Sequence, residues 1–172
     1  RFTKETFEEY RDRYPNGQVV HHYLSESWNR RAVVEPDLMV VSDLLPMITE
    51  EKKVAPHNGA FARVLGRYYR EEGLLDLMTA IKKMTLLQAQ RLEQFTPAFK
   101  TKGRLKVGSD ADITVFDVNT IIDRATYQDP YQASAGIHHV IVNGTLLFAI
   151  KNSLRMPTQV AELQPRAINR CI

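Results

Sequence analysis

Two short apolar segments with a helix between them constrain the fold of this chain more than any other feature. Residues 18–24 and 38–41 each have the apolar character of a buried strand. The segment between them, about 25–34, starts with a Ser-Glu-Ser pattern typical of a helix N-cap, and Pro36 prevents the helix from continuing. Apolar strands separated by a helix favour parallel pairing, so we predict a βαβ unit rather than a hairpin.

Helical periodicity runs through most of the remaining residues before Pro97. Apolar residues recur at helical spacing in four segments, and we predict helices there: residues 3–14, 60–72, 74–84 and 85–94. Gly73 is expected to end the second of these helices. From their surroundings, Trp28 and Met78 are expected in the core.

The pattern changes near Pro97 from helical to short β-type segments. Strands are predicted at residues 112–117, 137–142 and 145–149. Asn143 and Gly144 separate the last two strands, and this dipeptide favours a two-residue hairpin turn. We therefore predict two parts, an α/β part over residues 1–98 and a small β part over residues 99–172.

Composition and charge exclude several classes of protein. The 23 basic and 20 acidic residues are interspersed, whereas a nucleic-acid-binding protein usually gathers its basic residues into a patch. The apolar runs are far shorter than the roughly 20 residues of a membrane span. Cys171 is the only cysteine, which excludes a disulfide framework and a thiolate zinc site. We expect a cytoplasmic protein and, because the sequence opens on Arg1 without an initiator methionine, a fragment.

Asp43 is the first candidate catalytic residue, because it follows the apolar segment 38–41 closely. In α/β folds the carboxyl ends of parallel strands and the loops after them build the active site. The irregular stretch at residues 42–59 supports this interpretation, since loops longer than about 12–15 residues are usually functional or disordered. The alternative is an aspartate that caps a turn after a strand.

The five histidines do not form a recognisable metal site. They occur as two adjacent pairs and one single residue, and no spacing typical of metal ligands is present. His57 lies in the long stretch after Asp43 and is the best histidine candidate for lining a pocket. Ser42 and Asn58 are further candidates for lining the substrate site, and Asp43 is also a candidate metal ligand.

Residues 102–117 read K-G-R-L-K-V-G-S-D-A-D-I-T-V-F-D. This segment resembles the K-G-x-(I/L)-x-x-G-x-D-A-D-(I/L)-x-(V/L)-x-D signature of the amidohydrolase superfamily. Residues 85–92 resemble the T-x-x-P-A-x-x-L helix that precedes this signature, with Gln88 in place of the proline. In the superfamily the signature leads the chain out of a barrel and into a small β-sandwich.

Two further segments resemble a narrower family. Residues 40–46 (V-V-S-D-L-L-P) and 59–68 (G-A-F-A-R-V-L-G-R-Y) are similar to the S-D-G-x-P and G-T-F-x-R-V-L-G-x-Y pair of N-acyl-D-amino-acid deacylases. Residues 118–144 and the Pro-Arg-Ala-Ile at residues 165–168 are similar to the tail of that family. The resemblance covers nearly the whole chain from about residue 18.

The resemblance implies a fold and an activity. The fold is α/β, with the C-terminal portion of a TIM barrel in residues 1–98 and part of a small β-sandwich in residues 99–172. The activity is hydrolysis of the amide bond of N-acyl-D-amino acids by a zinc enzyme. Asp43 takes the position of the aspartate that accepts a proton from the metal-activated water and passes it to the leaving amine.

The departures from the family pattern matter equally. Leu44 replaces the glycine that follows the aspartate, and Asn58 stands where the family has the arginine of His-Pro-Arg. The metal ligands of the family lie in segments upstream of those present here. We therefore expect this chain to bind no zinc and to be inactive alone. Its open strand edges are expected to be covered by an upstream barrel segment or by a homo-oligomer.

Two alternatives stay open at this point. The chain can be a non-catalytic structural or interaction module descended from such an enzyme, an interpretation that Leu44 and Asn58 favour. It can also belong to an amidohydrolase that acts on another carbon–nitrogen bond, such as that of a cyclic imide, because the superfamily motifs are shared.

Overall fold

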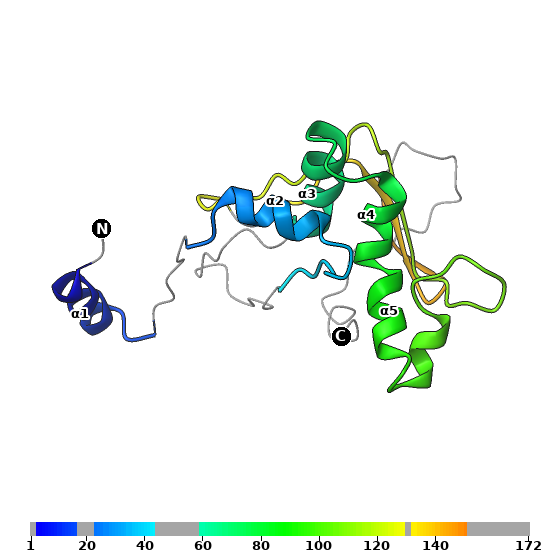
Figure 1. Cartoon of the computed structure of the whole chain (residues 1–172), viewed down its shortest axis with the longest axis horizontal. Helices are drawn as coiled ribbons and strands as arrows, with labels where there is room; N and C mark the ends of the chain where they lie inside the picture. The colour runs from blue at the N-terminus through cyan, green and yellow to red at the C-terminus, as the bar shows by residue number, and fades with distance from the viewer. Residues whose placement is uncertain (1–2, 17–22, 44–58, 130–131, 151–172) are drawn as a thin grey trace.

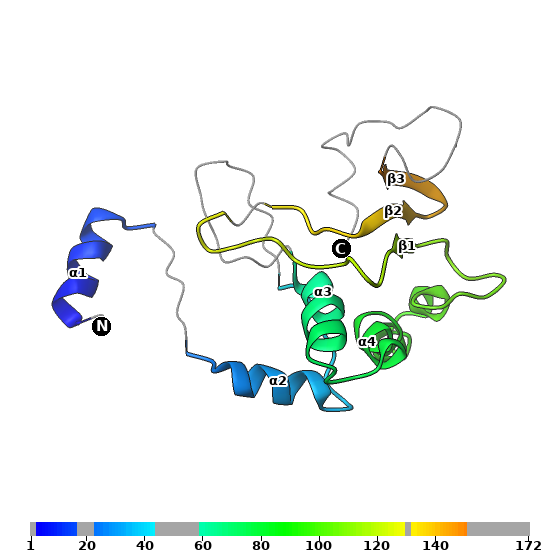
Figure 2. The same cartoon turned by 90° about the horizontal axis from the view of Figure 1, so that it is seen from above.

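The computed structural model of the chain describes residues 3–16, 23–43, 59–129 and 132–150. Helices make up one layer and a three-stranded antiparallel sheet the other, as Figures 1 and 2 show from two sides. Helix α1 (Lys4–Arg13) lies apart from both layers in these views. Within the described ranges, no helix is both long and apolar enough to cross a membrane.

The first two helices begin at capping side chains. At the start of α1 the Thr3 hydroxyl accepts a hydrogen bond from the backbone amide of Thr6 at 3.2 Å. At the start of α2 (Glu26–Val34) the Ser25 hydroxyl accepts one from the amide of Trp28 at 3.4 Å. Both helices were predicted, α1 from the spacing of its apolar residues and α2 from its N-cap pattern. The two caps satisfy amides that have no partner inside the helix. The expectation that Trp28 lies in the core is wrong: its side chain is 64% exposed, since no described element covers that face of α2.

The predicted helix at residues 60–72 forms, but its winding changes along its length. It begins as the α-helix α3 (Ala60–Arg63) and continues as the π-helix η1 (Val64–Glu71). Gly73 follows with a φ of 62°, the left-handed conformation expected of a residue that ends a helix. The buried side chains of this helix are those of Ala62, Val64, Leu65 and Tyr68.

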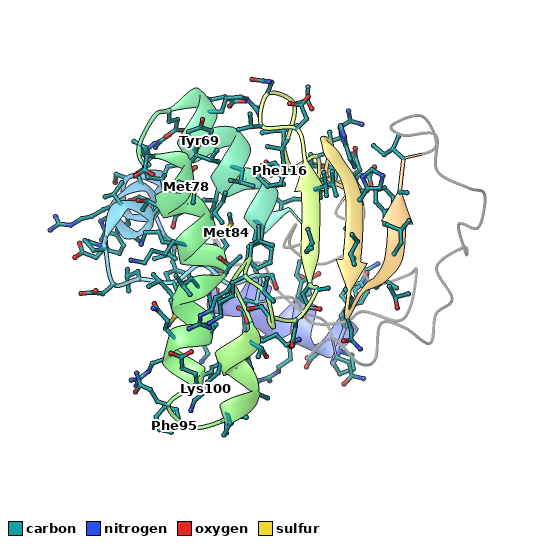
Figure 3. All side chains as sticks on the ribbon, turned by 90° about the vertical axis from the view of Figure 1, so that its right-hand side faces the viewer. Tyr69, Met78, Met84, Phe95, Lys100 and Phe116 are labelled. Carbon is teal, nitrogen blue, oxygen red and sulfur yellow. The ribbon has the colours of Figure 1, made fainter. Side chains whose placement is uncertain are left out.

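Helices α4 (Leu77–Met84) and α5 (Leu86–Leu92) follow, and then the 3₁₀-helix η2 (Pro97–Thr101). Figure 3 shows these helices beside the sheet, and both Met84 of α4 and Phe116 of the first strand pack against the core. Met78 was also expected there, but it is 69% exposed. Met78 and Met84 are about 120° apart around the axis of α4, so their side chains face different surroundings.

The sheet has the order β1-β2-β3, with β1 (Ile113–Phe116), β2 (Ile137–Val142) and β3 (Thr145–Ala149) all antiparallel to their neighbours. All three strands were predicted. Asn143 and Gly144 join β2 to β3 with φ values of 49° and 74°. A two-residue hairpin turn with both φ values positive suits the right-handed twist of the strands, so the predicted hairpin is confirmed.

The core lies where the helical layer meets the chain after β1. Its buried residues are Ala62, Val64, Leu65, Tyr68, Ala80 and Ile121. Ile121 is 2% exposed, and its carbonyl oxygen accepts a hydrogen bond of 2.5 Å from the Arg70 guanidinium. A Cβ atom on Gly66 would lie 2.5 Å from the same oxygen, so this glycine permits the close contact. The sheet-bearing part is thus fixed to η1 through Ile121.

The predicted βαβ unit is absent from the described part of the chain. Residues 38–41 have no regular secondary structure, and Leu38 and Val41 are 48% and 64% exposed. Of the other predicted strand, residues 18–22 lie outside the described residues, and the described Tyr23 and Leu24 are exposed. A strand is stabilised by hydrogen bonds to a neighbouring strand, and no described strand lies beside residues 38–41. The prediction of a buried strand there is therefore wrong for this structure.

Four charged side chains join α2 to η1. Glu72 accepts hydrogen bonds from Arg30 at 2.6 and 3.0 Å and from Arg67 at 2.9 Å. Arg67 also forms an ion pair of 2.9 Å with Glu26. Hydrogen bonds from the two guanidinium groups lower the pKa of Glu72 from its ordinary 4.5 to about 2. The network makes the contact between the two helices dependent on pH.

We expect the free energy of unfolding to contain a contribution from Glu72 that is fully present above pH 4.5 and lost as the pH falls towards about 2. The sign follows because the unfolded chain takes up the proton at higher pH than the folded chain does. Urea denaturation at about pH 6 and about pH 3 measures it. The variant Glu72→Gln should be less stable at the higher pH and show a weaker pH dependence. Glu8→Gln, which removes an exposed pair with Lys4 at 3.9 Å, should leave the pH dependence unchanged.

Candidate active site

Asp43 lies at the end of the irregular segment that follows α2. Its side chain is exposed, and its backbone is left-handed with a φ of 50°. Aspartate and asparagine adopt this conformation more readily than most residues. Ser42, directly before it, is half-buried. The carboxylate of Asp43 is therefore accessible to solvent.

The structure describes only two of the predicted site residues, Ser42 and Asp43. His57 and Asn58, predicted to line the substrate site with Ser42, lie outside the described residues, as does Leu44. The structure does show contacts that hold the chain before Asp43 and after residue 58. These two anchors involve residues that the sequence did not single out as parts of a site.

The first anchor is Lys83 of α4, whose side chain is only 1% exposed. Its ammonium group donates hydrogen bonds to the carbonyl oxygens of Glu35 and, at 2.6 Å, of Leu38. The carbonyl of Glu35 is at the C-terminal end of α2, where helix carbonyls have no partner within the helix and a positive charge is favourable. Burial lowers the pKa of Lys83, and the carboxylates of Glu35 and Asp37 offset part of this shift. A buried cation thus holds the turn that leads to residue 40.

Gln88 of α5 completes this anchor. Its amide nitrogen donates hydrogen bonds of 2.7 Å to the carbonyl oxygens of Val40 and Lys83. The backbone amide of Val40 in turn donates to the carbonyl of Lys83 at 2.9 Å. Both backbone polar groups of Val40 are therefore bound to the junction of α4 and α5. Val40 is the residue of segment 38–41 that packs against the core.

The second anchor holds the chain directly after residue 58. Gly59 is buried, and a Cβ atom on it would lie 2.2 Å from Cβ of Asp123. Arg63, one turn further on, forms an ion pair of 2.6 Å with the Asp123 carboxylate. The start of α3 is therefore fixed to the segment between β1 and β2. This contact joins two stretches that both carry motifs of the resemblance described above.

A sequence signal for Lys83 exists. It lies three residues after Ala80, which is fully buried, so it falls on the buried face of α4. A lysine on such a face has to find partners for its ammonium group. The signal could not identify those partners, because Glu35 and Leu38 precede Lys83 by 48 and 45 residues.

The described residues do not supply a zinc site on their own. Zinc in proteins is held by histidine, cysteine, aspartate and glutamate side chains, and most sites use three or four of them. Among the described residues, no group of three or more such side chains lies close enough together to hold a metal ion. Asp43, the predicted candidate ligand, is exposed and belongs to no such group.

Comparison with known proteins agrees with these motifs. The chain is 43% identical over 133 residues to an N-acyl-D-glutamate deacylase of Alcaligenes xylosoxydans xylosoxydans, an alignment that covers 76% of this chain and 25% of the relative. It is 38% identical over 126 residues to a D-aminoacylase of the same organism, which covers 73% of this chain and 25% of the relative. The chain thus spans about a quarter of the length of the curated relatives it matches.

The fold is shared as well. A crystal structure of an N-acyl-D-glutamate deacylase from Bordetella bronchiseptica, in complex with zinc and a phosphonate inhibitor, matches with a TM-score of 0.64 and 41% identity. The match covers 73% of this chain and 25% of that chain. Residues 42–148 match the model of the amidohydrolase family. The resemblance predicted from the motifs is confirmed, and the chain belongs to the amidohydrolase family.

Proposed function

We propose that this chain is the C-terminal segment of a zinc-dependent deacylase that hydrolyses the amide bond of N-acyl-D-amino acids. The observation that carries the proposal is the 43% identity over 133 residues to an N-acyl-D-glutamate deacylase. A further relative, an N-acyl-D-aspartate deacylase of the same organism, is also 43% identical, over 129 residues. These relatives favour a D-amino acid with an acidic side chain as the first substrate to test.

In the proposed reaction Asp43 moves one proton. Water attacks the carbonyl carbon of the acyl group, and the Asp43 carboxylate accepts a proton from that water. The same group then delivers the proton to the amide nitrogen, the carbon–nitrogen bond breaks, and a carboxylic acid and a D-amino acid are released. Ser42, His57 and Asn58 line the substrate in this proposal. Zinc, when bound in the complete enzyme, supplies Lewis acidity for the attack.

The remainder of the enzyme completes the site. We propose that residues 1–98 form the last part of a TIM barrel and residues 99–172 part of a β-sandwich. Exposed apolar side chains within residues 1–98 support the barrel assignment. Among them, Trp28 is 64% exposed, Leu38 48% and Val41 64%. In the proposal they pack against an upstream barrel segment, or against a second copy of the chain in a homo-oligomer. In the proposal the protein is cytoplasmic. The chain alone binds no zinc and is inactive.

The substrate class can be tested by reconstitution. The chain is mixed with zinc and the upstream segment of an N-acyl-D-glutamate deacylase, and hydrolysis is followed by release of the amine. We expect N-acetyl-D-glutamate to be hydrolysed at least about 100-fold faster than its L-enantiomer. Turnover of a cyclic imide without turnover of either acyl amino acid would favour action on another carbon–nitrogen bond. A folded complex that hydrolyses none of the three would favour a non-catalytic module.

A further inference from the structure

We propose that Lys83 and Gln88 are positioning residues for Asp43: they hold the backbone at residues 35–40 on the junction of α4 and α5 and thereby set where the Asp43 carboxylate lies. This inference rests on the proposed function, in which the Asp43 carboxylate transfers a proton and its position therefore matters.

The burial of Lys83 has an energetic cost. Lysine is almost never fully buried without a partner of opposite charge, yet the Lys83 side chain is 1% exposed and its hydrogen bonds go to backbone carbonyls. An apolar residue at this place would avoid the desolvation of a charge. What an apolar residue cannot do is bind the carbonyls of Glu35 and Leu38 at once. The advantage of lysine here is therefore geometric, since it fixes two points of one turn.

The terminal amide of Gln88 has a defined orientation. Two carbonyl oxygens lie within 2.7 Å of the terminal amide, so the group that faces them must be the NH₂ donor. This orientation leaves the amide oxygen of Gln88 buried without a hydrogen-bond partner among the described residues. A buried acceptor without a partner is unfavourable, because it has lost its hydrogen bonds to water. The orientation of Gln88 is thus set by the carbonyl oxygens of Val40 and Lys83.

The helix at residues 85–92 departs from the superfamily motif at one position. Gln88 stands where that motif has proline, and proline has no side-chain donor. In this chain the glutamine binds the carbonyl of Val40 while the backbone of Lys83 binds its amide. Val40 therefore receives the pair of hydrogen bonds that a neighbouring strand would give. Among the described residues no strand lies beside Val40, and the helix junction supplies both hydrogen bonds.

The anchored residues are close enough to Asp43 to control it. Asp43 is three residues beyond Val40, and three residues of extended chain span at most about 10 Å. Misplacing a catalytic group by about 1 Å can lower a rate roughly 100-fold. The direction in which the chain leaves Val40 therefore decides whether the carboxylate reaches the reacting atoms.

Two variants and two matched controls test the proposal in the full chain reconstituted with the upstream segment. Lys83→Met removes the buried donor, and Gln88→Leu removes the amide with little change of size. Lys82→Met and Gln90→Leu make the same changes at exposed positions of the same two helices. Gln88→Leu keeps the test valid if Lys83→Met fails to fold.

The first readout is hydrogen exchange of the Val40 amide, which needs no activity. We expect exchange to be at least about tenfold faster in both variants and unchanged in the controls. The second readout separates kcat from KM. We expect kcat to fall about 10- to 100-fold with KM changed by less than about threefold, because the misplaced group acts on the reaction rather than on binding.

Unchanged exchange at Val40 would overturn the anchoring. Faster exchange with an unchanged kcat would overturn the positioning role and leave Lys83 and Gln88 as stabilising residues only. If the reconstituted wild-type chain hydrolyses no acyl amino acid, the proposed function fails and the catalytic role of the anchor fails with it. The exchange measurement distinguishes these cases, since it reports on the anchor whether or not the complex is active.

Discussion

Asp43→Asn is expected to lower the deacylase activity of the reconstituted enzyme by about 10²- to 10⁴-fold, the range for removing a group that transfers a proton. Asparagine has the same size and adopts the left-handed backbone at φ 50° equally well, so the fold should be unchanged. What it loses is the ability to take up a proton. The loss should therefore appear in kcat, with KM changed much less.

The matched control for this variant is Asp12→Asn, which removes the same charge from the exposed surface of α1. Its activity should stay within about twofold of the wild type, as for a surface substitution away from the site. Circular dichroism should show equal helix content in all three proteins. If Asp43→Asn keeps more than about a third of the wild-type activity, Asp43 does not transfer the proton, and the aspartate is better described as a residue that ends a turn.

Gly136→Ala should produce the largest loss of stability among single substitutions in the β part. Gly136 has a φ of 77°, and a Cβ atom on it would lie 2.4 Å from the nitrogen and 2.5 Å from Cα of Ile121. Backbone atoms cannot move aside as a flexible side chain can. We expect a loss of about 2–5 kcal/mol, from about 1–2 for the left-handed backbone and the rest from crowding against the core.

Gly73→Ala separates the two causes of that loss. Gly73 has a similar φ of 62°, but a Cβ atom there would meet nothing within 4 Å. Its substitution should cost only about 1–2 kcal/mol. Urea denaturation of the two variants measures the difference directly. Equal losses would mean that crowding between Gly136 and Ile121 adds nothing to the cost of the left-handed backbone.

The sequence predicted the elements whose signals are local. The cap at Ser25, the left-handed Gly73 and the Asn143–Gly144 turn each act within a few residues, and each lies where the pattern placed it. These features determine helix ends and the hairpin irrespective of what packs around them. The motifs of the amidohydrolase family were equally readable, because they are contiguous stretches of sequence.

The errors concern what lies next to an element. Trp28, Met78 and residues 38–41 are apolar and were therefore predicted to be buried. The sequence could not show which elements cover them. In the structure Trp28 and Met78 are 64% and 69% exposed, and residues 38–41 have no neighbouring strand among the described residues. The contacts of Lys83 were missed for the same reason, since its partners lie 45 and 48 residues away. The predicted division at residue 98 stays a prediction.

The proposed contribution of this chain is a proton-transferring aspartate in a zinc deacylase whose metal ligands lie in other segments. It is tested most directly by measuring zinc content and hydrolysis of N-acetyl-D-glutamate for the purified chain, alone and mixed with the upstream segment of a related deacylase. We predict no stoichiometric zinc and no hydrolysis by the chain alone, and both in the mixture. Stoichiometric zinc together with hydrolysis by the chain alone would contradict this proposal.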